Sequence, residues 1–176
     1  MSGETYLTFR VADEVDRFFD ESSRTQGESP RLALIVGPVA TGKTTLRKEN
    51  YKTGFVVVDS VEIFLNMSRG EYHAFPNAFL EPMDIFGRLV ASRAIQERRN
   101  IVTEIIGADL DELKALIEAM TSIGYKVDVQ FVHCDLETAV RRNLDRGDDA
   151  ISAYHAGPFN VTWLMEAARA VDPGPA

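Results

Sequence analysis

The feature that most constrains the fold is residues 31–45, RLALIVGPVATGKTT, in which an apolar run leads into a glycine-rich turn. Residues 37–44, GPVATGKT, fit the pattern G-x-x-x-x-G-K-[ST], with a strand-like run before them and the helix-compatible LRKENY after them. In that setting, backbone N–H groups at a helix N-terminus converge on an anion. A turn that is merely rich in glycine and threonine is the alternative, but pattern and placement together indicate a nucleotide phosphate loop.

Each position of this loop has an expected task. Gly37 turns the chain off the strand, and Gly42 lets the backbone approach the ligand. Lys43 is expected to reach the β- and γ-phosphates and Thr44 to bind Mg²⁺ through its hydroxyl, so the expected ligand is ATP or GTP with Mg²⁺. At position 40, where many such loops carry glycine, this chain has alanine. The residues expected to surround the phosphates are Gly37, Pro38, Val39, Ala40, Thr41, Gly42, Lys43, Thr44 and Thr45.

Strand-like runs alternate with stretches of helical spacing along the chain, which predicts right-handed crossovers and an α/β fold. We expect a doubly wound parallel sheet of at least four strands, flanked by helices. The substrate is expected to lie against residues 60–90, within which residues 64–82, FLNMSRGEYHAFPNAFLEP, are expected to be rich in loops. The expected strands are 31–36, 55–59, 100–106 and 125–133, and the expected helices are 11–23, 83–99, 109–123, 136–146 and 161–171.

Composition restricts the partners. The net charge of −8 argues against a nucleic-acid binder, since such proteins gain affinity from clustered Lys and Arg. The single cysteine, Cys134, permits no intramolecular disulfide, and no run reaches the roughly 18 apolar residues that a membrane span requires. We therefore expect a soluble, cytoplasmic protein without nucleic-acid or membrane partners.

Asp59 ends the second expected strand, in VVVDS, so its carboxylate should project from the carboxyl edge of the sheet beside the phosphate loop. There it could serve as the base that meets an acceptor hydroxyl. The alternative is an N-cap for a helix that begins at Ser60. Glu62 is the second candidate for the base, and both carboxylates are expected to border the substrate.

Glu104 ends the third expected strand among apolar neighbours, in IVTEII, and therefore needs a partner if it is buried. It could hold Mg²⁺ through water or bind a substrate hydroxyl. A structural ion pair is the other interpretation.

Arg142 and Arg146 are four residues apart and so share one face of a helix. Carried at the edge of a helical lid formed by residues 146–158, they could neutralise the transferring phosphoryl group. The alternative is a solvated basic face that pairs with Asp145, Asp148 and Asp149.

From about Pro30 to Ala168 the chain resembles the zeta toxin family of P-loop kinases. The resemblance is carried by ALIVGPVATGKTTLR, FVVVDSVEIF, SRAIQERRNIVTEIIG and GYKVDVQFVHCDLETAVRRN. Because 176 residues suit one domain, we expect a single P-loop kinase-like domain over residues 1–176, in which residues 1–29 form an N-terminal helical extension.

The resemblance also implies a function. Zeta toxins phosphorylate a hydroxyl of UDP-N-acetylglucosamine, and many are restrained by an antitoxin protein, so a kinase of a small molecule, with an antitoxin partner, is expected. By position, Lys43 and Thr44 match the family's phosphate loop, and Glu104 its acidic residue. The family's second strand typically ends in Asp-x-Asp, whereas DSVE has valine at the second position, so either Asp59 or Glu62 is the base. The alternative function is a catalytically degenerate ATP-binding protein that acts through a partner.

Overall fold

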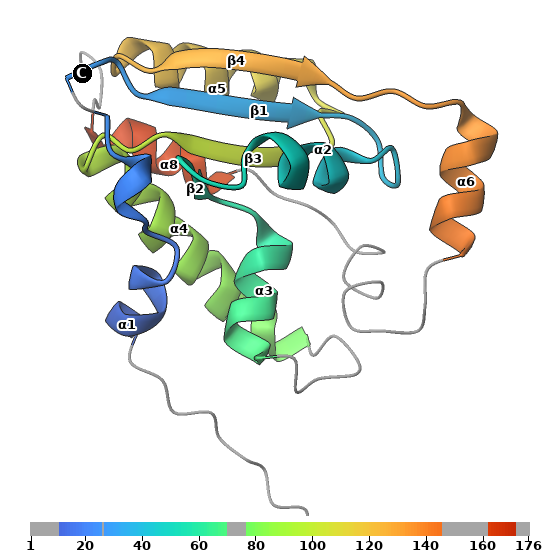
Figure 1. The fold of residues 1–176 in the computed structure, drawn as a ribbon, viewed down its shortest axis with the longest axis horizontal. Helices are drawn as coiled ribbons and strands as arrows, with labels where there is room; N and C mark the ends of the chain where they lie inside the picture. The colour runs from blue at the N-terminus through green and yellow to red at the C-terminus, as the bar shows by residue number, and fades with distance from the viewer. Residues whose placement is uncertain (1–10, 26, 70–76, 146–161, 172–176) are drawn as a thin grey trace, which may run out of the picture.

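The computed structural model describes residues 11–25, 27–69, 77–145 and 162–171, and its centre is one parallel sheet. The strand order is β2-β3-β1-β4, so the first strand is central (Figure 1). Strands are found at all four expected places, although β2 is only two residues long. Their bounds are β1 (Arg31–Val36), β2 (Val56–Val57), β3 (Ile101–Ile105) and β4 (Lys126–Phe131).

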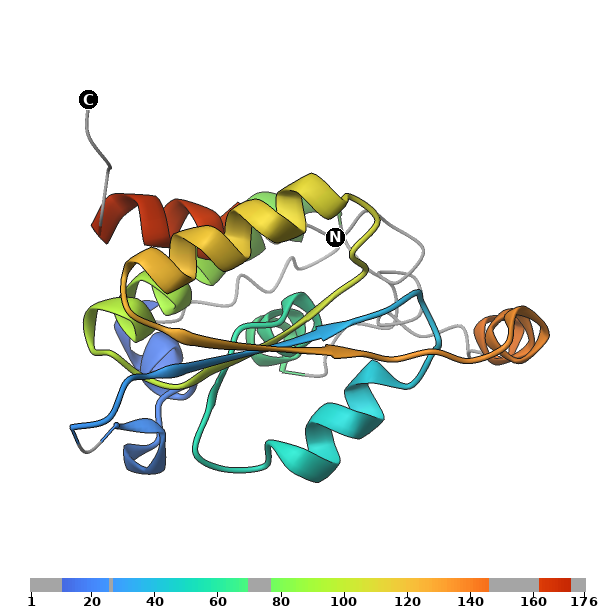
Figure 2. The same ribbon diagram turned by 90° about the horizontal axis from the view of Figure 1, so that it is seen from above.

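Helices lie on both faces of the sheet, which confirms the doubly wound α/β fold. Figure 2 shows α5 and α8 on one side and α2 on the other. None of the helices in the described ranges is long and apolar enough to cross a bilayer. The helices are α1 (Val11–Asp16), η1 (Glu21–Ser23), α2 (Lys43–Asn50), α3 (Ser60–Ser68), η2 (Asn77–Phe79), α4 (Leu80–Gln96), α5 (Leu110–Ser122), α6 (Leu136–Leu144) and α8 (Thr162–Val171).

The expectation of loops over residues 64–82 is wrong at both ends of that stretch. Its first five residues continue α3, because Ile63, Phe64 and Met67 give this segment an apolar face that packs into the core. Its last residues form η2 and the start of α4, which begins three residues earlier than expected. Residues 70–76 lie outside the described ranges.

The central strand explains why the sequence reads as an unbroken apolar run. Leu32, Leu34 and Val36 face the larger core, shared with α4, α5 and α8, while Ala33 and Ile35 face the side covered by α2. All five residues are buried. A parallel strand that is covered on both faces has no reason to alternate polar with apolar residues.

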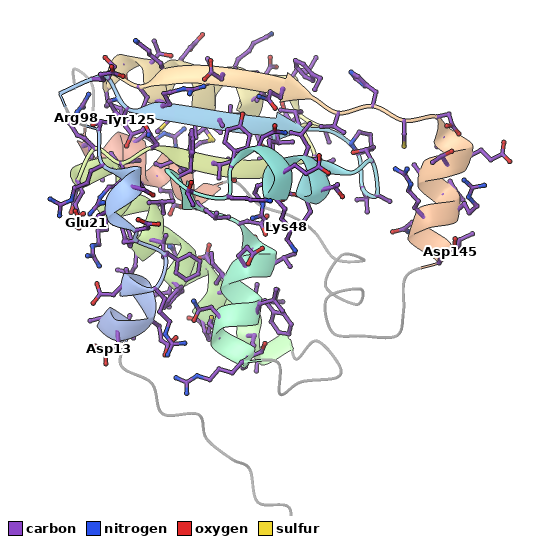
Figure 3. The ribbon with its side chains drawn as sticks, in the orientation of Figure 1. Asp13, Glu21, Lys48, Arg98, Tyr125 and Asp145 are labelled. Carbon is purple, nitrogen blue, oxygen red and sulfur yellow. The ribbon has the colours of Figure 1, made fainter. Side chains whose placement is uncertain are left out.

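The amino end of the sheet, opposite the phosphate loop, is held by polar contacts. Figure 3 labels Arg98 and Tyr125 there, away from Lys48 on α2. Arg99 is only 2% exposed, and it pairs with Glu97 at 2.7 Å and donates to the backbone oxygen of Asp20 at 3.0 Å. Through these contacts Arg99, just before β3, is bonded to the residue that follows α4 and to the residue that precedes η1.

Candidate functional site

The phosphate loop lies between β1 and α2 with the geometry that its glycines predict. Gly42, which immediately precedes α2, has a φ of +102°. Residues that carry a Cβ atom rarely adopt this backbone conformation. At Gly37 the limit is space, because a Cβ atom there would lie 2.4 Å from the carbonyl oxygen of Val132. The first glycine thus lets the loop pass close to the end of β4.

Replacing Gly37 by alanine is expected to destabilise the fold by about 1–3 kcal/mol, the usual cost of forcing an extra carbon into packed surroundings. The clash is with backbone, which cannot rotate away as a side chain can. Urea denaturation measures the change. A variant as stable as the wild type would mean that the loop does not pass against Val132.

Ala40 has a φ of +63°, so the position at which the loop departs from the common glycine is strained. This conformation costs a residue with a Cβ about 1–2 kcal/mol, whereas glycine loses about 0.5–1 kcal/mol through its extra freedom in the unfolded chain. Ala40→Gly is therefore expected to raise the free energy of unfolding by up to about 1 kcal/mol. Urea denaturation checks the sign, and a loss of stability would contradict the left-handed backbone at this position.

A cavity of about 660 Å³ opens over the loop at the carboxyl end of the sheet. Lys43 lines it, with Nζ donating to the backbone oxygens of Gly37 at 2.8 Å and Pro38 at 2.9 Å. Thr44 donates its hydroxyl to Oε2 of Glu104 at 2.8 Å. The expected site residues that line this cavity are Val39, Ala40, Gly42, Lys43, Thr44, Thr45, Asp59, Glu104 and Arg142.

Asp59 is the N-cap that one of the two sequence alternatives predicted, and its position also leaves the other alternative, the base, open. Its Oδ1 atom caps α3 by accepting from the backbone N–H groups of Val61 at 3.0 Å and Glu62 at 3.2 Å. Its carboxylate also lines the cavity. Within the described residues, its second oxygen accepts no hydrogen bond and is available to a ligand.

The surroundings of Asp59 raise its pKa to about 7. Burial is the main cause, because it disfavours the charged form, and the negative charge of Glu104 adds to it. The positive charge of Arg47 and the backbone N–H of Glu62 act in the opposite direction. A carboxylate with this pKa accepts a proton near neutral pH, as a general base must.

Glu62 and Glu104 are joined by Arg47, a residue that the sequence interpretation did not select. Arg47 donates Nε to Oε1 of Glu104 and an Nη atom to Oε1 of Glu62, both at 2.6 Å. Glu62 lines a second cavity with Arg47 and is absent from the lining of the first, so only Asp59 of the two candidate bases borders the phosphate loop. The ion pair that was one interpretation of Glu104 is confirmed, and the same carboxylate also accepts from Thr44.

Arg142 lines the cavity from α6, a helix that stands beside the sheet and buries none of its residues (Figure 1). Figure 3 marks the end of this helix at Asp145. Arg146 and the rest of the expected lid, residues 146–158, lie outside the described ranges.

Comparison with known proteins identifies the family. The family model described as "Zeta toxin" matches residues 77–173, more than half of the chain. The chain belongs to the zeta toxin family. The matched region of this zeta toxin homologue carries Glu104 and Arg142, whereas the phosphate loop and Asp59 precede it.

Solved structures support the same fold for this zeta toxin family member. One is from the PezAT chromosomal toxin-antitoxin system of Streptococcus pneumoniae, with 14% identity, a TM-score of 0.59 and coverage of 76% of this chain and 58% of that one. Another is from the Pnkp1/Rnl/Hen1 complex, with 17% identity, a TM-score of 0.51 and coverage of 67% and 40%. This chain thus matches only about half of each structure's length. No match was found among curated proteins.

Proposed function

We propose that this chain is a phosphotransferase that moves the γ-phosphoryl group of ATP, or of GTP, to a hydroxyl of a small molecule such as a UDP-amino sugar. The observation that carries the proposal is that Asp59, of which only Oδ1 accepts hydrogen bonds from the described residues, shares a cavity with Lys43 and Thr44 of the phosphate loop. Membership of the zeta toxin family supports it. We further propose that residues 1–176 act as one kinase domain, with residues 1–29 as an N-terminal extension.

The side chains present fit a nucleotide with Mg²⁺. Thr44 and Glu104 offer a hydroxyl and a carboxylate 2.8 Å apart, which are the oxygen ligands that Mg²⁺ prefers, directly or through water. A Cβ at Gly42 would meet no atom within 4 Å, which leaves room above the loop backbone. When bound, the metal ion neutralises charge on the phosphates.

In the proposed reaction, Asp59, Lys43 and Arg142 have different roles. Asp59 orients the acceptor hydroxyl and takes its proton while the hydroxyl oxygen forms a bond to the γ-phosphorus. The bond from that phosphorus to the bridging oxygen breaks, and the nucleoside diphosphate leaves. Lys43 exchanges its loop carbonyl partners for phosphate oxygens, and Arg142 balances the negative charge of the transferring group.

The test is an acceptor screen followed by phosphorus NMR. The wild-type protein is incubated with ATP, Mg²⁺ and each of a panel of hydroxyl compounds, UDP-N-acetylglucosamine among them. A new phosphoester signal that grows as the γ-phosphate signal falls supports the proposal. Nucleotide signals that shift on binding, with no phosphoester from any acceptor, would support the second candidate function.

That second candidate is an ATP-binding protein without catalysis, which acts through a partner. It is favoured by the absence of a carboxylate two residues after Asp59, where Val61 lines the cavity. The next carboxylate, that of Glu62, is paired with Arg47 instead. Of the two bases that the sequence offered, only Asp59 is among the described residues that line this cavity. The structural match to a chain from a toxin-antitoxin system supports an antitoxin as the partner for either function.

A further inference from the structure

Arg47 is almost completely buried although it carries a charge. It is 5% exposed, and it lies one turn beyond Thr44 on α2, so the two residues share one face of that helix. Both contact the same carboxylate: the Thr44 hydroxyl donates to Oε2 of Glu104 and Arg47 donates to Oε1. Two residues on one face of α2 thus donate hydrogen bonds to the two carboxylate oxygens of Glu104.

Arg47 also reaches the helix that carries the candidate base. Its second ion pair is with Glu62, and the backbone N–H of Glu62 donates to Oδ1 of Asp59. The guanidinium therefore connects α2, the end of β3 and the first turn of α3. The first two of these elements supply Thr44 and Glu104 to the cavity, and Asp59, which caps α3, lines it as well.

Arg47 itself does not line the cavity over the phosphate loop. It borders a separate cavity of about 710 Å³, together with Glu62. Any effect that it has on phosphoryl transfer must pass through the carboxylates that it holds. Burying a guanidinium has a large desolvation cost, which two short ion pairs offset.

We propose that Arg47 is a positioning residue that fixes Glu104 for the metal ion, an inference that rests on the proposed function. By binding one carboxylate oxygen, it directs the other toward Thr44, so that hydroxyl and carboxylate meet Mg²⁺ already oriented. Outer groups that orient metal-binding side chains typically change metal affinity about 10–100-fold when they are removed. If the ion pairs of Arg47 were merely structural, removing them would lower the stability of the fold and leave the Mg²⁺ dependence of nucleotide binding unchanged.

The test is Arg47→Lys, which keeps the charge but replaces the planar fork by a single ammonium group. ADP binding is measured calorimetrically in EDTA and over a series of Mg²⁺ concentrations, independently of turnover. We expect the half-saturating Mg²⁺ concentration to rise about 10-fold or more, with ADP binding in EDTA unaltered. The double variant Arg47→Met, Glu62→Gln keeps the net charge and is expected to raise the half-saturating Mg²⁺ concentration to a similar extent. It replaces Arg47→Lys in the test if that variant does not fold.

Arg99→Lys is the matched control, because Arg99 is also buried and ion-paired but lies at the opposite end of β3. It should lower the thermal midpoint and leave the Mg²⁺ dependence at the wild-type value. Equal Mg²⁺ dependence in wild type and Arg47→Lys, or an equal shift in Arg99→Lys, would overturn the inference alone. A wild-type protein that binds ADP equally with and without Mg²⁺ would overturn the proposed function first, and this inference with it.

Discussion

Replacing Lys43 by alanine is expected to lower the rate of phosphoryl transfer by about 10²–10³-fold while the protein stays folded. Lys43 lines the cavity in which the γ-phosphate is expected, and its ammonium group donates to two loop carbonyls. Removing it takes away a fixed positive charge from the point at which negative charge develops. Transfer from γ-labelled ATP to the identified acceptor measures the effect.

Circular dichroism and thermal unfolding of Lys43→Ala provide the control. The thermal midpoint should stay close to that of the wild type, because the lysine fills no core position. Lys48→Ala is the matched variant, since Lys48 is an exposed lysine on the same helix, and it should transfer phosphate at the wild-type rate. Undiminished turnover in Lys43→Ala would exclude this loop as the phosphate site.

Replacing Asp59 by asparagine is expected to suppress transfer by about 10²–10⁴-fold and, without ligand, to stabilise the protein above neutral pH. Asparagine caps a helix as well as aspartate does, so α3 should keep its first turn. What disappears is a base and a buried negative charge beside Glu104. Nucleotide affinity should change little.

The pH dependence of stability gives this variant a second, independent signature. The folded-state pKa of about 7 lies above the ordinary value of 3.8, so between about pH 4 and pH 7 the folded protein holds a proton that the unfolded chain has lost. The contribution of Asp59 to stability is therefore complete at low pH and is lost as the pH rises through 7. After allowance for partial solvent exposure, the loss is on the order of 2 kcal/mol, or about 4–8 °C in thermal midpoint.

Thermal unfolding in EDTA, without nucleotide, measures this difference. The variant should unfold at the higher temperature at pH 8, and its lead over the wild type should be clearly smaller at pH 5, where only part of the contribution of Asp59 has been lost. A gap that is widest at pH 5, or absent at both values, would show that Asp59 is not the group with the raised pKa.

The sequence predicted the frame of the site because the relevant signals are local. The phosphate loop is one continuous motif, and the apolar runs of β1 and β3 reflect strands that are covered on both faces. The ends of α5 also agree with local residue types, since the Asp109 side chain caps the helix and Gly124, just after it, has a φ of +85°. Apolar helical spacing around Phe64 and Met67 could also have revealed α3, but the glycine and proline that follow obscured it.

Arg47 was missed because its partners lie 15 and 57 residues further along the chain. Only folding brings the three side chains together, and no local spacing encodes that meeting. Two signals were nevertheless available: Glu104 among apolar neighbours required a cation, and Arg47 shares a helical face with Thr44. The same long-range contacts separate Asp59 from Glu62, because Glu62 pairs with Arg47 while Asp59 lines the cavity over the phosphate loop.

The most direct test of the account is transfer of labelled γ-phosphate to the acceptor by wild type, Asp59→Asn and Glu62→Gln, assayed side by side at saturating ATP and Mg²⁺. We expect label on the acceptor with wild type and almost no label with Asp59→Asn. Glu62→Gln should transfer far more label than Asp59→Asn does. Transfer by Asp59→Asn at the wild-type rate, or an inactive Glu62→Gln beside it, would contradict the assignment of Asp59 as the base beside the phosphate loop.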